Sequence, residues 1–228
     1  MEIITLFSFF LYRIIKGKIN IKTIYFNFKY FPTKIALKTP IIINNNVYLR
    51  STSGQISIDQ EIYFGMINIG KPGIGIFDEK KSRTIWQVYG QVIFNGKASI
   101  GHGSKISVQK NAILEFGKNF IITAESSIIC TKSIKFGENN LFSWDIQIMD
   151  SDLHQILNDK AEVLNQPKEI IVGNSVWICS RCLILKGSII PDNSIIGGQS
   201  VVSKKLTPNN ALFAGNPITC IKENVSWK

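Results

Sequence analysis

Two histidines are the only side chains in this 228-residue chain whose ordinary pKa lies between pH 5 and 8. One of them, His154, stands in the polar stretch MDSDLHQI (149–156), two residues after Asp152 and four after Asp150. An imidazole can take a proton from a reacting hydroxyl, and a nearby carboxylate can fix its tautomer. The stretch is therefore the first candidate for acid–base chemistry, and a solvated loop histidine is the alternative.

The other histidine and the cysteines carry weaker signals. His102 lies at a corner of the repeat described below, and we expect a structural role for it. Cys179 and Cys182 form a C-x-x-C pair, but a zinc site would need two more ligands at matching spacing, so no metal is expected. A redox pair is the alternative. The default for all four cysteines, which include Cys130 and Cys220, is buried or half-buried thiols in a reducing compartment, the cytoplasm.

Composition indicates one sizeable folded core. The chain is 45% hydrophobic, and its formal net charge of +10 is compatible with nucleic acid, an anionic membrane surface or an acidic substrate as partner. The lysines are spread thinly and no arginine-rich block is present. Nucleic acid, which has only the net charge in its favour, is therefore not expected as a partner.

A strict period of six residues runs through residues 172–202, VGNSVWICSRCLILKGSIIPDNSIIGGQSVV. A helix would place apolar residues about every 3.6 positions and a half-buried strand every second. Period six instead indicates short strands joined by corners, three of which make one turn of a parallel β-helix. The aliphatic positions are Val172, Ile178, Ile184, Ile190, Ile196 and Val202; small residues follow four positions later at Val176, Cys182, Ser188, Ser194 and Ser200.

The same spacing continues upstream with additions. Between Ile100 and Ile148 the apolar positions lie six or eight apart, which indicates extra residues at some corners. Before residue 100 the period fades, although residues 54–59 and 89–96 look like strands of opening coils. Residues 71–86 read as a protruding loop or hairpin. The fold predicted is therefore all-β, a parallel β-helix.

The period stops after Ile148 and resumes at Val172. The intervening stretch is too short for a domain and too long for a corner, so we expect a loop ejected from the stack over residues 149–171. Loops on a rigid scaffold often carry function, and His154 lies at the root of this one.

The N-terminal stretch MEIITLFSFFLYRIIKGK is apolar, but it begins with Glu2 and lacks the cleavage site of a secretory signal. Its uncharged run ends at Arg13, short of the ~20 residues that a membrane span needs. We expect a short amphipathic helix that packs on the domain or a subunit; peripheral membrane contact is the alternative. The predicted division is an N-terminal extension (1–40) and a β-helix domain (41–228) with a C-terminal return segment (207–228).

Together these motifs resemble a known family, the left-handed β-helix acyltransferases built from hexapeptide repeats. More narrowly, the chain resembles the O-acetyltransferases of sugars and bacterial surface polysaccharides such as capsule and lipopolysaccharide. The motifs that carry the resemblance are the D-x-H loop, VWI (176–178), IIGGQSVVSKKL (195–206), AGNP (214–217), NFKYFPTKIALKTPI (27–41) and KENVSW (222–227).

The resemblance implies a homotrimer with acetyl-CoA in a groove between adjacent prisms. It also implies that His154 is the general base that deprotonates an acceptor hydroxyl, with Asp152 as the nearest candidate to orient the ring and Asp150 the second. Trp177 matches a tryptophan at the site, and packing under the loop is the alternative. The cofactor positions implied are Trp177, Ser180, Gly198, Ser203, Lys204 and Lys205.

The acceptor side of the resemblance is less well matched. Trp144 and Asp145, just before the loop, and Asp150 are the residues expected to line it. The positive charge fits an acidic acceptor such as a sialic-acid-containing capsule. Three readings stay open: O-acetylation of a polysaccharide sugar, N-acetylation of a nucleotide-linked amino sugar, and a non-catalytic β-helix that binds or supports other molecules.

Overall fold

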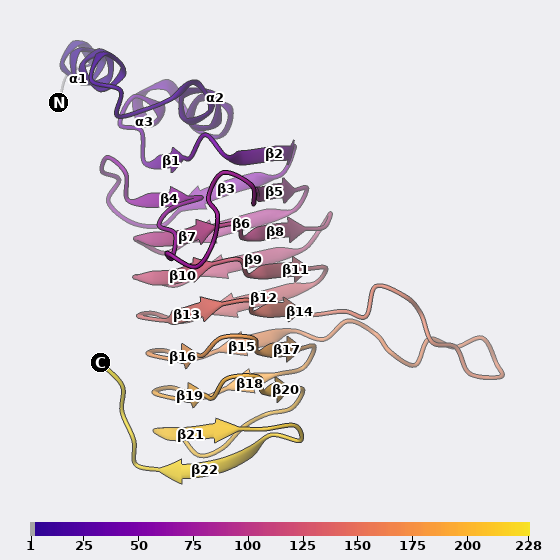
Figure 1. Cartoon of the computed structure of the whole chain (residues 1–228). Coiled ribbons are helices and arrows are strands. Elements are labelled where there is room, and N and C mark those ends of the chain that lie inside the picture. The colour runs from indigo at the N-terminus through magenta and orange to yellow at the C-terminus, as the bar shows by residue number, and fades with distance from the viewer. Residues whose placement is uncertain (1–2) are drawn as a thin grey trace.

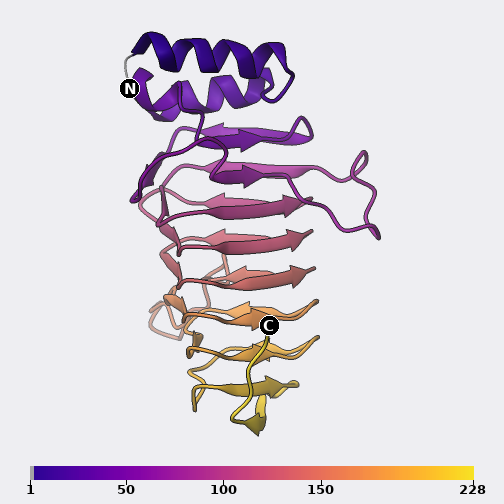
Figure 2. The ribbon, with the colours of Figure 1, turned by 90° about the vertical axis from the view of Figure 1, so that its left-hand side faces the viewer.

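The computed structural model describes residues 3–228, so Met1 and Glu2 of the expected N-terminal helix lie outside the described residues. The chain forms a three-sided stack of coils with a layer of helices over its first coil (Figures 1 and 2). All neighbouring strands of the coils pair in parallel, and only the last strand is antiparallel. The prediction of a parallel β-helix is therefore confirmed.

Three sheets form the sides of the prism. The nine-stranded sheet contains β1 (Ile41–Ile43), β4 (Ile67–Ile69), β7 (Ala98–His102), β10 (Phe120–Ala124), β13 (Leu141–Trp144), β16 (Trp177–Ile178), β19 (Ile195–Ile196), β21 (Ala211–Ala214) and β22 (Thr219–Glu223). The seven-stranded sheet contains β2 (Val47–Thr52), β5 (Thr84–Val88), β8 (Lys105–Val108), β11 (Ser127–Cys130), β14 (Gln147–Met149), β17 (Leu183–Leu185) and β20 (Val201–Val202). The six-stranded sheet contains β3 (Gln55–Ile58), β6 (Gln91–Phe94), β9 (Ile113–Phe116), β12 (Ser133–Phe136), β15 (Ile170–Val172) and β18 (Ile189–Ile190).

The period of six places one buried apolar side chain on each side of every coil. Ile184, for example, pairs in register with Ile148 above and Val202 below, and all three are fully buried. In the six-stranded sheet, the inward side chains of the earlier coils are aromatic, and the ring centroids of Phe94 in β6 and Phe116 in β9 lie 5.1 Å apart in a stacked arrangement. The coils therefore share one continuous core along the axis of the prism.

The small residues fit the corners as expected. Ser188, Ser194 and Ser200 are fully buried, and each hydroxyl donates to the carbonyl oxygen three residues earlier, at 2.6 to 2.7 Å. A larger side chain would have no room at these corners. The serine hydroxyl also satisfies a backbone carbonyl that the turn leaves without a hydrogen bond. Asn193, just before one of these serines, takes a left-handed conformation with φ 56°, which asparagine tolerates well.

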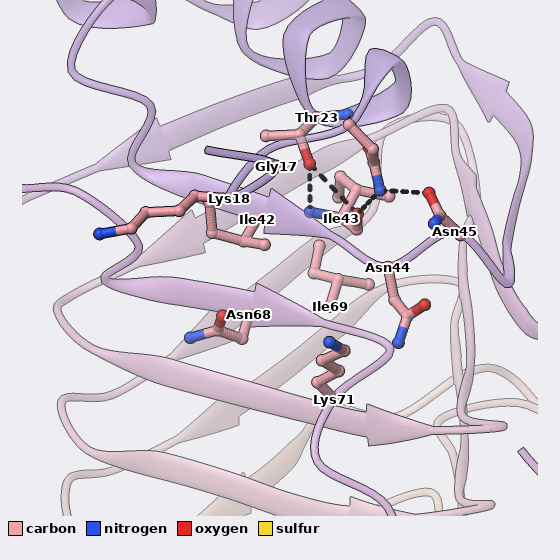
Figure 3. Close-up of a pocket in the computed structure, with 11 residues that line it drawn as sticks. Gly17, Lys18, Thr23, Ile42, Ile43, Asn44, Asn45, Asn68, Ile69 and Lys71 are labelled. Atoms are coloured by element: carbon pink, nitrogen blue, oxygen red, sulfur yellow. Dashed lines mark hydrogen bonds between the residues drawn. The ribbon is translucent and has the colours of Figure 1, made fainter. Parts of the chain in front are cut away.

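Three helices, rather than the single one expected, cover the first coil: α1 (Ile3–Ile15), α2 (Ile21–Tyr30) and α3 (Thr33–Ala36). Thr23 of α2 accepts from the backbone N–H of Ile43 at 2.9 Å, and Asn27 donates to the carbonyl of Ile41 at 2.7 Å (Figure 3 shows the Thr23 contact). Side chains of α2 therefore take the place of a further strand, which protects the open edge of β1. The junction also encloses a small cavity of about 140 Å³ beside Lys18 and Lys71.

Two segments leave the stack, and both fall where the period fails. Residues 70–83 protrude between β4 and β5, and residues 150–169 form the larger excursion between β14 and β15 (Figure 1). At the other end of the prism, β22 folds back on β21, and the last residues run back up past the coils (Figures 1 and 2). Among residues 3–228, no helix is long and apolar enough to cross a membrane.

Candidate functional site

The ejected loop is a small hairpin with an ordered root. Leu157 and Val163 form an antiparallel bridge, and the N–H of Leu164 donates to the carbonyl of Ile156 at 2.8 Å. The loop closes where the N–H of Lys168 donates to the carbonyl of Asp150 at 3.0 Å. These bonds give the residues near the root, including His154, a defined backbone position.

Asn165 holds the backbone on both sides of His154. Its side-chain amide donates to the carbonyl of His154 at 2.8 Å and to Asp152 Oδ2 at 2.7 Å, and its Oδ1 accepts from the N–H of Ile156 at 2.7 Å. The imidazole itself is exposed. The loop thus presents the histidine ring to solvent from a fixed backbone.

Asp152 was expected to orient the imidazole, but its carboxylate has other partners. Lys186, from the next coil, donates its Nζ to Asp152 Oδ2 and also to the carbonyl of Asn165 at 3.0 Å. Hydrogen bonds from Lys186 and Asn165 hold the pKa of the Asp152 carboxyl below its ordinary value. In this arrangement Asp152 ties the loop to the coil stack.

Asp150 lies inside the coil at the base of the loop. It is fully buried and accepts from the backbone N–H groups of Thr131, Lys132 and Ser133 at 2.7, 2.7 and 2.8 Å, and from the Thr131 hydroxyl at 2.7 Å. The Asp150 carboxylate therefore satisfies the backbone N–H groups of the corner between β11 and β12 in the preceding coil. This placement gives it a structural task and leaves no surface for an acceptor sugar.

The other expected residues lie along two edges of the prism. We call the edge between the nine- and seven-stranded sheets the 9/7 edge, and the edge between the seven- and six-stranded sheets the 7/6 edge. Trp144, Ser180 and Gly198 line an open groove of about 530 Å³ at the 9/7 edge. Asp145 lies at the same edge, and its carboxylate is 3.8 Å from Arg181 Nε.

The ejected loop leaves from the 7/6 edge, and Ser203 and Lys204 lie at the same edge two coils further on. Both side chains are exposed, as is Lys205, which bridges to Ile189 of the six-stranded sheet. The basic side chains therefore share an edge with His154, whereas the groove at Gly198 lies on a different edge.

Trp177 lies on the outer face of the nine-stranded sheet, away from both edges. Its indole Nε1 donates to Ser143 Oγ at 3.2 Å, and its ring lies 6.2 Å from that of Trp227 in the C-terminal segment. Trp227 in turn donates to the carbonyl of Ser175 at 2.7 Å. Within one chain, Trp177 is thus half-covered by the returning C-terminus.

Comparison with known proteins gives related enzymes over part of the chain. No family model matches it. It is 32% identical to the galactoside O-acetyltransferase of Escherichia coli K12 over 112 residues, which cover 48% of this chain and 54% of that protein. Two polysialic acid O-acetyltransferases match as well: that of Neisseria meningitidis is 32% identical over 54% of this chain and 56% of its own length, and that of E. coli O1:K1 is 30% identical over 54% and 40%.

Over about half of its length, the chain is similar in sequence to O-acetyltransferases that act on galactosides and polysialic acid. It spans about half the length of these curated relatives. Among solved structures, the polysialic acid O-acetyltransferase OatWY aligns over 82% of this chain and 86% of its own, at 21% identity and a TM-score of 0.48. A galactoside acetyltransferase in complex with coenzyme A aligns over 58% and 64%, at 26% identity and a TM-score of 0.49. The left-handed form of the β-helix stays a prediction.

The candidate site contains contacts that the sequence analysis did not anticipate. Asn165 and Lys186 carry no signal in the sequence, because one is an ordinary polar residue of a loop and the other stands at a corner of the repeat. Only the stacking of coils brings Lys186 to Asp152. Ile76, from the protruding segment 70–83, likewise reaches the groove at the 9/7 edge.

The remaining candidate groups of the chain stand apart from this site. His102 is almost fully buried beneath the segment 70–83, where its Nε2 lies 3.8 Å from Glu125 Oε1. Cys130 and Cys182 are buried, and burial raises the pKa of the Cys182 thiol to about 11. Cys220 is exposed, contrary to the expectation of a buried or half-buried thiol. Within residues 3–228, no three potential ligands gather around a metal position.

Proposed function

We propose that this chain is an acetyl-CoA-dependent O-acetyltransferase that modifies a sugar hydroxyl of a bacterial surface polysaccharide, with His154 as the general base. The observation that carries the proposal is the exposed imidazole on a loop root that Asn165 and Lys186 hold in place. Sequence relationship to galactoside and polysialic acid O-acetyltransferases supports the reaction class.

The chemistry requires a base close to the acceptor hydroxyl. A sugar hydroxyl attacks a thioester slowly unless its proton is removed during the attack, and an imidazole can accept that proton and pass it to the leaving thiolate. The carbonyl carbon gains the sugar oxygen and loses the sulfur, so free coenzyme A and an ester are the products. Holding both reactants together supplies much of the remaining acceleration.

The residues present suit the parts of acetyl-CoA. At the 9/7 edge, Gly198 lies beside the carbonyl oxygen of Ser180 and carries no side chain, so a ligand can approach the backbone closely there. Lys204 and Lys205 supply exposed ammonium groups for phosphate at the 7/6 edge, near Ser203.

One chain does not bring these parts together, and we infer that a homotrimer does. In a threefold ring, the 9/7 edge of each copy faces the 7/6 edge of the next, so His154 of one copy meets the groove at Gly198 of its neighbour. Such a head-to-tail contact closes when the rotation per copy is a third of a turn. The proposed trimer thus completes three identical sites.

The acceptor proposed is anionic, such as a sialic-acid-containing polymer. The 7/6 edge carries exposed lysines above the loop as well as below it, at Lys110, Lys132 and Lys204. A row of positive charge would attract an acidic polymer toward His154. The proposal includes a cytoplasmic location, which four free cysteines support.

The decisive experiment measures free thiol released from acetyl-CoA in the presence of an acidic polysaccharide, a neutral polysaccharide or a nucleotide-linked amino sugar. We expect release that requires the acidic polysaccharide and falls by ~10²-fold or more in His154→Ala. Leu157→Ala, an exposed position at the far part of the same loop, is the matched control and should retain activity.

Each outcome bears on a separate part of the proposal. Equal activity of His154→Ala and wild type would remove His154 as the base. Turnover with the amino sugar alone would reassign the enzyme to N-acetylation. If no acceptor is modified and acetyl-CoA does not bind, measured by calorimetry, the chain is a non-catalytic β-helix.

A further inference from the structure

The helical layer exposes an unusual amount of apolar surface. In α1, only Leu6 and Phe10 are buried, whereas Ile4 and Ile15 are 72% and 80% exposed. With 3.6 residues per turn, Ile4, Phe7, Leu11 and Ile15 form one stripe on the side away from the buried pair. The other exposed apolar residues of the layer are Ile3, Phe9, Tyr12, Ile14, Ile21, Tyr25 and Phe28.

The same layer carries positive charge without negative charge. Residues 3–40 contain seven basic residues and no acidic one. Arg13 and Lys22 donate to backbone carbonyls within the domain, but Lys16 and Lys18 are exposed at the end of α1, beside the ring of Tyr12. Lys29 of α2 and Lys34 of α3 are exposed as well.

The geometry suits a helix that lies on a surface. Figures 1 and 2 show α1 as the outermost element at one end of the prism, over the first coil and away from the coil that bears the ejected loop. A helix of 13 residues is about 20 Å long, which is short of the ~30 Å hydrocarbon core of a bilayer. The bonds from Thr23 and Asn27 to β1 fix the layer to the coil stack.

We propose that the helical layer (residues 3–40) docks the protein on an anionic lipid surface, with the α1 stripe in the interface and the exposed lysines on lipid headgroups. Aromatic and aliphatic side chains on one face with basic residues beside them are typical of interfacial helices. The docked end leaves the 9/7 and 7/6 edges free along the prism. The inference does not depend on the proposed reaction.

Charge favours lipid over a second copy of the chain. If two copies met through this face, Lys16 and Lys18 of each would face the same positive surface on the other, which opposes association. An anionic leaflet instead attracts each lysine, with about a fivefold gain in binding per lysine near the surface.

The test is sedimentation of the full chain with vesicles of phosphatidylcholine, with and without phosphatidylglycerol. We expect binding to the anionic vesicles at least about tenfold above the neutral ones, weakened by salt. Replacing Phe7→Gln and Leu11→Gln together should reduce binding at least about tenfold, because two exposed apolar side chains leave the interface. Lys16→Gln with Lys18→Gln should reduce binding to anionic vesicles only.

Matched controls lie elsewhere on the surface. Ile221→Gln removes an exposed apolar side chain at the opposite end of the stack, and Lys97→Gln with Lys118→Gln removes two exposed lysines from the coils. These variants should bind as wild type does. Two results with vesicles would overturn the proposal: equal binding to neutral and anionic vesicles, or no binding to either. Self-association without lipid that Phe7→Gln and Leu11→Gln abolish would also overturn it and would assign the face to a second copy.

Discussion

Lys186 and Asp152 join the ejected loop to the coil that follows it. Lys186 Nζ donates to Asp152 Oδ2 and to the carbonyl of Asn165, and Asn165 donates to the carbonyl of His154. The residue proposed as the base is thus connected to the rigid stack through two side chains. Disturbing this connection should move His154 without unfolding the prism.

Lys186→Met should lower kcat at least about tenfold, because a small displacement of a catalytic group costs much of the rate. The KM for acetyl-CoA and the melting temperature should change little, since Lys186 holds the ejected loop and lies outside the core of the coils, and its partner Asp152 is exposed. Steady-state kinetics and thermal unfolding check this. Lys160→Met, an exposed lysine at the loop tip, is the control, and an equal loss of kcat in both variants would contradict the prediction.

Asn165→Ala should lower kcat by a similar factor. It removes the donor to the His154 carbonyl and the acceptor of the Ile156 N–H, so the backbone around the base loses its fixed position. Asn158→Ala is the matched control, because it removes an asparagine that serves only the turn at the loop tip. The comparison fails if the two variants lose the same activity.

The root of the loop should loosen at acidic pH. Hydrogen bonds from Lys186 lower the pKa of Asp152, and a hydrogen bond from Ser133 lowers that of Glu169 at the other end of the loop. A carboxyl whose pKa is lower in the folded state than in the unfolded state stabilises the fold fully above its ordinary pKa of about 4. This stabilisation is lost as the pH falls through the pKa of the folded state.

Cleavage of the loop by pepsin should therefore become faster as the pH falls below about 4. The increase should exceed the change in pepsin's own activity, which is measured on an unfolded substrate at each pH. Mass spectrometry of the fragments locates the cuts. Asp152→Asn should be cleaved faster than wild type already at the upper end of pepsin's range. A pH profile identical to that of the unfolded substrate would show that neither carboxyl holds the loop.

Asp150→Ala should destabilise the fold by about 3–5 kcal/mol, because three backbone N–H groups and the Thr131 hydroxyl lose a buried carboxylate. Urea unfolding measures the loss. Asp159→Ala, at the tip of the ejected loop, is exposed and should change stability little. A small effect of Asp150→Ala would mean that water replaces the carboxylate.

Lys204→Gln should raise the KM for acetyl-CoA about tenfold with little change in kcat, since a charged contact to phosphate contributes to binding. A thioester donor without the nucleotide phosphates should be used equally well by both enzymes. Lys118→Gln, an exposed lysine on another edge, is the control. An unchanged KM would remove Lys204 from the cofactor site.

The sequence alone determined the coil, its core and its interruptions. A residue that returns every sixth position must face inward on each side of a three-sided coil, so Ile178, Ile184 and Ile190 could be assigned to the core without a structure. The loss of the period after Ile148 located the loop and placed His154 at its root. These features depend only on the spacing of residues along the chain, which can be read directly from the sequence.

Only the tertiary structure decided which side chains meet. Asp150 and Asp152 look alike in sequence, yet Asp150 is buried under backbone donors and Asp152 binds Lys186 from the next coil. The reason is that Asp150 still lies at the corner of the coil, next to the end of β14, whereas Asp152 lies in the loop that leaves the stack. Likewise, the edge that an outward residue occupies depends on every insertion before it. The separation of Gly198 from His154, and the α2 side chains that close the edge of β1, follow from how the coils stack, which no local pattern records.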